Sequence, residues 1–248
     1  MIDLSIVIPV FNDSAVLPEL YKRLHPVLDR LALRHEIILV DDGSDDDSGL
    51  VLRKLQADDY NIRIILLSRN FGQSNAIAAG LEQCRGNIVV VMDSDLEDRP
   101  EDIPSLLKAL EENGVQMAIA RRCIRHDPLP RRLASRLFFR IANLFTIIRQ
   151  MPDLGVFRVF YRREYARIME NTDLKGTILS RFYQAQTPFT TIDLEKDKRF
   201  AGRSGYSFAK RIKLALDRLL PHLKHQRFRQ ERQPCFEIRE IIEIRETK

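Results

Sequence analysis

Short apolar runs that alternate with stretches of helical spacing constrain the fold of this chain more than any other feature of its sequence. The runs are rich in Ile, Val and Leu with little polar alternation, which is typical of strands buried on both faces of a sheet. They lie at residues 4–10, 35–42, 61–68, 86–93 and 114–120. Apolar residues recur every three or four positions over 16–31 and 103–110, which predicts helices there. The alternation predicts an α/β fold with a doubly wound, mainly parallel sheet and helices on both faces.

Length and composition exclude several classes of protein. The 248 residues, 44% of them hydrophobic, suffice for a large core, so disorder and a disulfide-stapled miniprotein are excluded. No apolar run reaches 18 residues and the N-terminus lacks a basic region, so we expect neither a membrane-spanning helix nor a signal peptide. Cys84, Cys123 and Cys235 are far apart without a CxxC pair, which favours a reducing, cytoplasmic compartment and no zinc site.

Charge is divided unevenly along the chain. Residues 1–120 hold 11 Lys and Arg against 21 Asp and Glu, a net charge of −10, and residues 121–248 hold 29 against 14, a net charge of +15. Two solvated faces of opposite sign would produce this division. An acidic half that holds a cation and a basic half that meets phosphate or an anionic surface would produce it too.

Ligands of open α/β sheets bind beyond the carboxyl ends of the strands, so the residues after each predicted strand are the candidates. Neither GxGxxG nor GxxxxGK[ST] follows any of them, which disfavours a dinucleotide site and a P-loop. Carboxylates follow instead. Asp93 and Asp95, with Glu97 two residues on, suit Mg²⁺ or Mn²⁺, hard cations that take oxygen ligands. The alternative is that acidic residues here cap the next helix, as expected of Glu101 and Asp102.

The stretch DDGSDDD, residues 41–47, has two interpretations. Its five carboxylates repel one another, so a solvated turn with Ser44 or Asp45 as a helix N-cap explains most of them. Asp41 and Asp42 still belong to the predicted strand. We expect these two to face the crevice, where either accepts hydrogen bonds from a nucleobase or ribose.

Six ordered segments, SIVIPVFND, LVDDGSDD, LSRNFGQSNAIAAG, VVVMDSDLED, DLGVFR and KRFAGRSGY, resemble the inverting glycosyltransferases of family 2. The branch of dolichyl- and polyprenyl-phosphate mannose and glucose synthases is similar over residues 1–215. The resemblance implies the GT-A fold in a domain over 1–220, with a nucleotide-sugar half (1–120) and an acceptor half (121–220). A basic linker and short extension (221–248) follow.

The resemblance implies roles for individual residues. On the donor side, Asp93, Asp95 and Glu97 match the metal and diphosphate positions, Asp42 matches the residue that contacts the base, and the remaining substrate-binding positions are Pro9, Phe11, Asp13 and Ser94. Phe11 and Asp13 replace Tyr and Glu of the family pattern, and Glu97 replaces a frequent Gln. Arg121 and Arg131 match arginines that reach the donor or the acceptor phosphate. Arg158 lies in the segment that matches the acceptor loop, and Arg199 and Ser204 match a phosphate-contacting loop. Asp153 matches the best candidate for a catalytic base. Gly205 stands where the branch has Lys, which weakens the assignment of the acceptor.

The implied activity is metal-dependent, inverting transfer of a sugar from a UDP- or GDP-sugar to a polyprenyl phosphate. Transfer to a sugar hydroxyl of a lipid-linked, lipopolysaccharide or capsular glycan is the alternative, which the missing Lys and the absence of apolar spans favour. A nucleic-acid-binding protein, indicated by a pI near 9.2, is disfavoured by the acidic half. A catalytically silent scaffold is disfavoured by the intact Asp93, Asp95 and Arg199.

The basic half predicts a peripheral position on the cytoplasmic face of the cell membrane. Residues 133–148 and 206–220 have an apolar stripe with flanking cations, as in interfacial helices on anionic lipid, although a helix packed on the protein's own core shows the same stripe. The alternation of apolar residues in 234–248 predicts a short strand, with a pairing surface for a second subunit as one hypothesis. Expected partners are therefore a nucleotide sugar, a lipid-phosphate or glycan acceptor, an anionic membrane, and a second copy or a membrane-anchored subunit, without nucleic acid.

Overall fold

The computed structural model describes residues 2–122, 154–171, 176–195, 197, 200 and 235–243. Its strands are β1 (Leu4–Val10), β2 (His35–Asp41), β3 (Ile62–Leu67), β4 (Ile88–Val91), β5 (Met117–Arg122), β6 (Leu154–Tyr161), β7 (Phe189–Leu194) and β8 (Ile238–Ile242). Its helices are α1 (Leu17–Leu31), α2 (Ser48–Asp58), α3 (Gln73–Glu82), the 3₁₀ turn η1 (Pro100–Asp102), α4 (Ile103–Glu112), α6 (Arg162–Glu170) and α7 (Ile178–Gln184).

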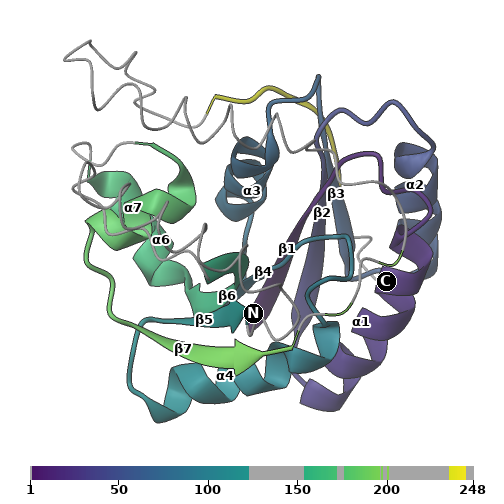
Figure 1. Cartoon of the computed structure of the whole chain (residues 1–248). Coiled ribbons are helices and arrows are strands. Elements are labelled where there is room, and N and C mark those ends of the chain that lie inside the picture. Colours follow the sequence, from purple (N-terminus) through teal and green to yellow (C-terminus); the bar gives the residue numbers. More distant parts are fainter. Residues whose placement is uncertain are drawn as a thin grey trace, which may run out of the picture.

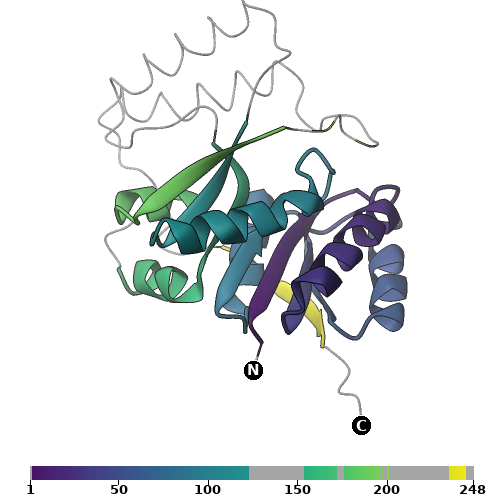
Figure 2. The same ribbon diagram turned by 90° about the horizontal axis from the view of Figure 1, so that it is seen from below.

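The described strands form one sheet in the order β7-β5-β6-β4-β1-β2-β3-β8. β1 pairs in parallel with β2 and β4, and β2 pairs in parallel with β3. β6 is antiparallel to both β4 and β5, β7 is parallel to β5, and β8 is antiparallel to β3. Figure 2 shows β7 (green) and β8 (yellow) toward opposite ends of the sheet. The predicted mainly parallel sheet is confirmed.

Helices cover both faces of the sheet, as predicted (Figure 1). One core packs α1, α2 and α4 against the sheet, and a second core packs α3, α6 and α7 against the other face. Gly80 brings α3 close to the sheet, because a Cβ there would lie 2.4 Å from Val7 Cγ1. This close packing holds the C-terminal part of α3 against β1 and β2. The N-terminus of α3 is part of the site described below.

Several predicted elements match the structure within a few residues. The apolar runs at 4–10 and 35–42 are β1 and β2, and the spacing over 16–31 is α1, whose inward stripe includes Leu20, Leu24 and Leu28. The strand predicted within 234–248 is β8, which pairs with the chain's own β3. The predicted amphipathic helices at 133–148 and 206–220 lie outside the described residues.

Two further sequence expectations concern thiols and membrane spans. Of the three cysteines, Cys84 is buried and Cys235 is exposed, and both are free thiols. Within the described ranges, no helix combines the length and the apolar character that crossing a membrane requires.

Candidate active site

The candidate site is built from the loops that follow β1, β2, β3 and β4. These strands are parallel neighbours, so their carboxyl ends meet at one edge of the sheet (Figure 1). Asp13 follows β1, Asp41 ends β2 and Asp42 follows it, and Asp93 and Asp95 follow β4. The predicted donor-side carboxylates are therefore brought to the same edge.

The acidic stretch after β2 fastens the loop after β1. The Asn12 N–H donates to Ser44 Oγ at 3.0 Å, and the Asp45 N–H donates back to Asn12 Oδ1 at 2.9 Å. The Ser14 N–H donates to Asp46 Oδ2 at 3.1 Å. Asp46 is therefore exposed to solvent and also holds the loop after β1 in place. The predicted capping is not seen: α2 begins at Ser48, three or more residues after the proposed caps.

Asp42 is held at the centre of the site by the loop after β3. Only 3% of the residue is exposed, and its Oδ1 and Oδ2 accept the N–H groups of Phe71 and Gly72 at 2.7 and 2.9 Å. Burial raises the pKa of Asp42, against the lowering effect of these two N–H groups. Each carboxylate oxygen has a second lone pair, so the geometry leaves acceptor capacity for a base.

A glycine allows the loops after β2 and β3 to touch. Gly43 has φ +68°, and a Cβ there would lie 2.4 Å from the carbonyl carbon of Arg69. Arg69 in turn stacks on the ring of Phe71, with Cζ 4.2 Å from the ring centre. Phe11, at the end of β1, is 42% exposed. Phe11 and Phe71 therefore offer aromatic surfaces near the carboxyl ends of β1 and β3, of the kind on which a nucleobase packs.

The acidic turn after β4 is fixed by its neighbours. Gln73, the first residue of α3, donates from Nε2 to Asp93 Oδ1 at 2.5 Å. Ser94, which is buried, donates from Oγ to Asp13 Oδ2. The Glu97 N–H donates to Asp95 Oδ1 at 3.0 Å. Three loops therefore meet at this turn, and Gln73 is a contact that the sequence reasoning missed.

The donor set at this turn fits a hard divalent cation that substrate oxygens complete. Within the described ranges, no three His, Cys, Asp or Glu side chains form a ready-made metal cage. Mg²⁺ and Mn²⁺ do not require such a cage, because they are commonly held by one or two carboxylates plus substrate phosphate. Asp93 and Asp95 are two carboxylates on one turn directly after a buried strand, which matches that manner of binding.

The two described arginines of the acceptor side have different surroundings. Arg121, on β5, forms an ion pair with Asp193 of β7, with Nε–Oδ1 at 2.5 Å and Nη2–Oδ2 at 2.8 Å, and both side chains are about half exposed. Arg158, on β6, is 2% exposed. Its Nε and Nη2 donate to the carbonyl oxygens of Val156 and Gly155 at 3.1 and 2.7 Å.

Arg158 therefore holds the backbone of the DLGVFR segment, which is strand β6 from Leu154 onward. Burial lowers the pKa of Arg158, whereas Tyr183 and Asp93 raise it. Its guanidinium lies 5.8 Å from the centre of the Tyr183 ring. Arg158 lies opposite Val91 of β4, two residues before Asp93, so the buried cation adjoins the acidic turn.

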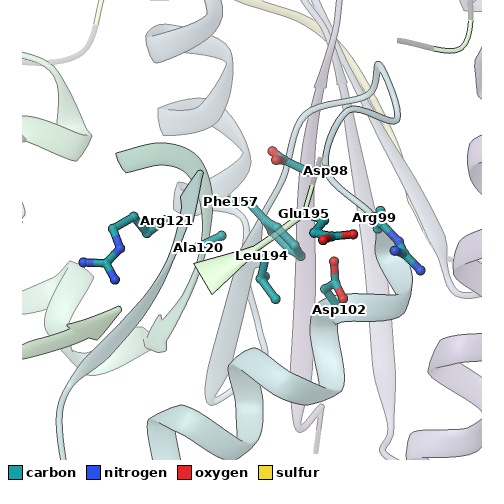
Figure 3. Close-up of a pocket in the computed structure, with 8 residues that line it drawn as sticks. All are labelled: Asp98, Arg99, Asp102, Ala120, Arg121, Phe157, Leu194 and Glu195. Carbon is teal, nitrogen blue, oxygen red and sulfur yellow. The ribbon is translucent and has the colours of Figure 1, made fainter. Parts of the chain in front are cut away.

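A small pocket adjoins the acidic turn, between the start of α4 and the ends of β5 and β7 (Figure 3). Its cavity volume is about 10 Å³, and the rest of the hollow is open to solvent. Phe157 and Leu194 form its apolar wall. Figure 3 shows the carboxylates of Asp102 and Glu195 facing each other, and the Arg121 guanidinium turned away. Burial raises the pKa of Asp102, with Arg99 lowering it. The sequence reasoning did not single out this pocket.

Other predicted residues have simpler positions. Pro9 is buried inside β1, opposite Val40 of β2. Glu101, predicted as a capping residue, pairs with Arg23 of α1 at 2.8 Å. Four predicted site residues lie outside the described residues: Arg131, Asp153, Arg199 and Ser204.

Comparison with known proteins gives consistent relatives. The chain is 36% identical over 219 residues to the undecaprenyl-phosphate 4-deoxy-4-formamido-L-arabinose transferase of Shewanella sediminis, and 38% identical over 219 residues to that of Pseudomonas fluorescens. Each alignment covers 87% of this chain, but only 65% and 63% of the relative. The chain therefore spans just under two thirds of the length of these curated relatives.

A solved structure has the same fold. The glucosyl-3-phosphoglycerate synthase of Mycobacterium tuberculosis, crystallised with Mn²⁺ and UDP-glucose, superposes with a TM-score of 0.62 over 88% of this chain and 79% of its own, at 19% identity. This likeness confirms the predicted GT-A fold. The sequence model of "Glycosyl transferase family 2" matches residues 5–168, which contain all four strand-end loops. With its acidic strand ends and this match across two thirds of its length, the chain belongs to glycosyl transferase family 2.

Proposed function

We propose that this protein transfers a sugar, with inversion, from a nucleoside diphosphate sugar to a polyprenyl phosphate. The observation that carries the proposal is the meeting of three loops at the acidic turn, where Gln73 donates to Asp93 and Ser94 donates to Asp13. The relatives named above act on undecaprenyl phosphate, which supports the acceptor. The structural neighbour binds Mn²⁺ and UDP-glucose, which supports the donor class.

The donor would lie across the carboxyl ends of β1 to β4. In this proposal the base packs against Phe11 and donates a hydrogen bond to Asp42. The Phe71 and Gly72 N–H groups hold the Asp42 carboxylate in place. Pro9 shapes the end of β1. Asp13 and Ser94, which are hydrogen-bonded to each other at the acidic turn, contact the ribose and the diphosphate.

Asp93 and Asp95, with Glu97, would hold Mg²⁺ or Mn²⁺ together with the donor diphosphate. Such an ion neutralises charge on the leaving diphosphate. The chain's own part is to aim the carboxylates: the Gln73 amide orients Asp93, and the Glu97 N–H orients Asp95. Carboxylates that are already held in place need no rearrangement when the cation and the diphosphate bind.

The acceptor would approach from the β5–β6 side. A phosphate is already ionised at neutral pH, so it needs cations more than it needs a base. We assign this cationic role to Arg158 and Arg121, together with Arg131 and Arg199 of the sequence, and a hydrogen bond to the phosphate to Ser204. A phosphate oxygen attacks the anomeric carbon while the bond from that carbon to the diphosphate oxygen breaks. Asp153 would act as a base only for a hydroxyl acceptor, whose proton it would take.

We further propose that the protein acts at the cytoplasmic face of the cell membrane, as a peripheral protein, alone or with a second subunit. The acceptor lipid and the basic sequences at 121–149 and 206–232 support this position. Sedimentation with vesicles of anionic or of neutral lipid tests it. Binding to anionic vesicles that falls with added salt is expected, and equal binding to both lipids would contradict it.

The direct test of the reaction uses purified protein with Mn²⁺, a panel of UDP- and GDP-sugars, and undecaprenyl phosphate in detergent. Mass spectrometry should detect a lipid heavier by one sugar residue, in which the phosphate has become a diester. Asp95→Ala should abolish the product while leaving the circular dichroism spectrum unchanged. Sugar transfer to a glycan hydroxyl, with none to the lipid phosphate, would overturn the assigned acceptor and favour the glycan alternative.

A further inference from the structure

The C-terminal segment, residues 235–243, reaches the site although its sequence carries none of the family motifs. Figure 1 shows it (yellow) crossing above α3 before it turns down along β3. The Cys235 N–H donates to Asn75 Oδ1 at 3.2 Å. Ser68, the first residue after β3, donates from its N–H to the Glu237 carbonyl oxygen at 2.9 Å and from Oγ to Glu237 Oε2 at 3.0 Å.

These contacts hold the two ends of one loop. The β3–α3 loop, residues 68–75, begins at Ser68 and ends in the first turn of α3 at Asn75. Asn75 also donates from Nδ2 to the Phe71 carbonyl oxygen at 2.9 Å, within the same loop. The C-terminal segment therefore contacts this loop at both ends, Ser68 and Asn75. Asn75 in turn holds the middle of the loop through Phe71.

The same loop contacts both acidic groups of the site. Its Phe71 and Gly72 N–H groups hold Asp42, and its Gln73 amide holds Asp93. A shift of the loop by a few tenths of an ångström would change both contacts at once, because hydrogen bonds weaken steeply with distance and angle.

The segment is itself firmly attached at its other end. Glu243 forms two hydrogen bonds with Arg63, at 2.9 and 3.0 Å, and one with Arg85 at 2.8 Å. Arg63 is 3% exposed. Glu240, within β8, pairs with Arg53 of α2 at 2.7 Å. The strand is therefore an integral part of the sheet and offers a fixed support for the loop.

We propose that Glu237 is a positioning residue for the donor site, which keeps the β3–α3 loop in the geometry that Asp42 and Asp93 require. The inference rests on the proposed function in that the positioned groups bind a nucleotide and its cation. It assigns a role to a C-terminal segment that none of the family motifs includes.

The test compares variants that differ in one contact. Glu237→Ala removes the side-chain bond to Ser68, and Glu237→Gln keeps an acceptor there. Glu240→Ala is the matched control, because it removes an exposed glutamate bond from the same segment but toward α2. Deleting residues 235–248 would be a poor test, since it removes β8 and uncovers Arg63. Two readouts are measured on the full chain: amide hydrogen exchange at Phe71 and Gly72, and calorimetric binding of UDP and of GDP with Mn²⁺.

We expect Glu237→Ala to speed exchange at both amides and to weaken nucleotide binding about fivefold, the usual effect of one such hydrogen bond. Glu237→Gln and Glu240→Ala should stay within about twofold of the unmodified protein, which is less than one hydrogen bond contributes. Equal exchange rates in Glu237→Ala and Glu240→Ala would overturn the positioning role, whatever happens to binding. If the unmodified protein binds neither nucleotide, the proposed function fails, while the exchange comparison still decides the role of Glu237.

Discussion

At the scale of single residues, hydrogen-bond donors orient the acidic groups of the site, and for Asp42 and Asp93 these donors come from another loop. Gln73 of α3 orients Asp93, and the N–H groups of Phe71 and Gly72 orient Asp42. Carboxylates crowded at one sheet edge repel one another, so they keep a fixed geometry only where donors hold them. Aspartates at the strand ends could be predicted from sequence. Gln73 could not, because its role depends on α3 beginning beside the turn that follows β4.

Gln73→Ala should weaken nucleotide binding in the presence of Mn²⁺ about tenfold, because Asp93 loses the donor that orients it. The free energy of unfolding should change little, since the contact is exposed. Calorimetric titration with UDP or GDP and Mn²⁺ measures the effect. Gln83→Ala, at the far end of α3, is the control. Equal affinity in the two variants would show that Asp93 does not depend on Gln73.

Gly43→Ala should destabilise the fold by about 2–3 kcal/mol, through strain at positive φ together with a clash against the next loop. Gly114 is a matched control, because it also has positive φ, +59°, but no atom within 4 Å of its missing Cβ. Gly114→Ala should cost only about 1 kcal/mol. Urea unfolding of both variants measures the difference, and equal losses would rule out the tight contact between Gly43 and Arg69.

At the scale of elements, β1 to β5 were easier to predict than β6 and β7. β1, β2 and β3 are buried on both faces, so each is a continuous apolar run. β7 is FTTIDL, mostly half-buried, and carries no such run. The DLGVFR segment was predicted as an acceptor segment from its resemblance to the family, and no strand was predicted there. In the structure, β6 starts at Leu154. Antiparallel pairing of β6 with two neighbours leaves no local signature in the sequence.

β8 is held in place by an ion-pair network with a predictable pH dependence. Glu243 contacts the buried Arg63, which lies 3.7 Å from the buried Glu36. The hydrogen bond from Arg63 lowers the pKa of Glu243 below its usual value of 4.5, with burial acting in the opposite direction. The stabilisation is therefore fully present above pH 4.5 and is lost as the pH falls through the lowered value.

Glu243→Gln should reduce the free energy of unfolding by about 1 kcal/mol at pH 7, a modest figure because the Glu243 side chain is half exposed. The difference from the unmodified protein should shrink as the pH falls below 4.5 and the glutamate is protonated. Chemical unfolding at several pH values measures it. A difference that stays constant down to strongly acidic pH would contradict the ion-pair explanation.

At the scale of the whole molecule, the acidic half of the sequence corresponds to the part of the sheet that carries the strand-end site. Residues 1–120 supply β1 to β4 and every acidic group of the strand-end site. The fold and the family could be predicted, because they depend on burial patterns and on motifs in a fixed order. The identity of the base and of the sugar could not, because selectivity depends on the shape of a pocket that several loops build together.

The central claim is that Asp93 and Asp95 bind a nucleoside diphosphate through a divalent cation. Its most direct test is calorimetric titration of UDP and GDP into the unmodified protein and into Asp95→Asn, each with and without Mn²⁺. The account predicts that one nucleotide binds the unmodified protein at least tenfold more tightly with Mn²⁺, a gain of about 1.4 kcal/mol, and that Asp95→Asn loses this gain. Binding that is equally tight without the metal, or unchanged in Asp95→Asn, would contradict it.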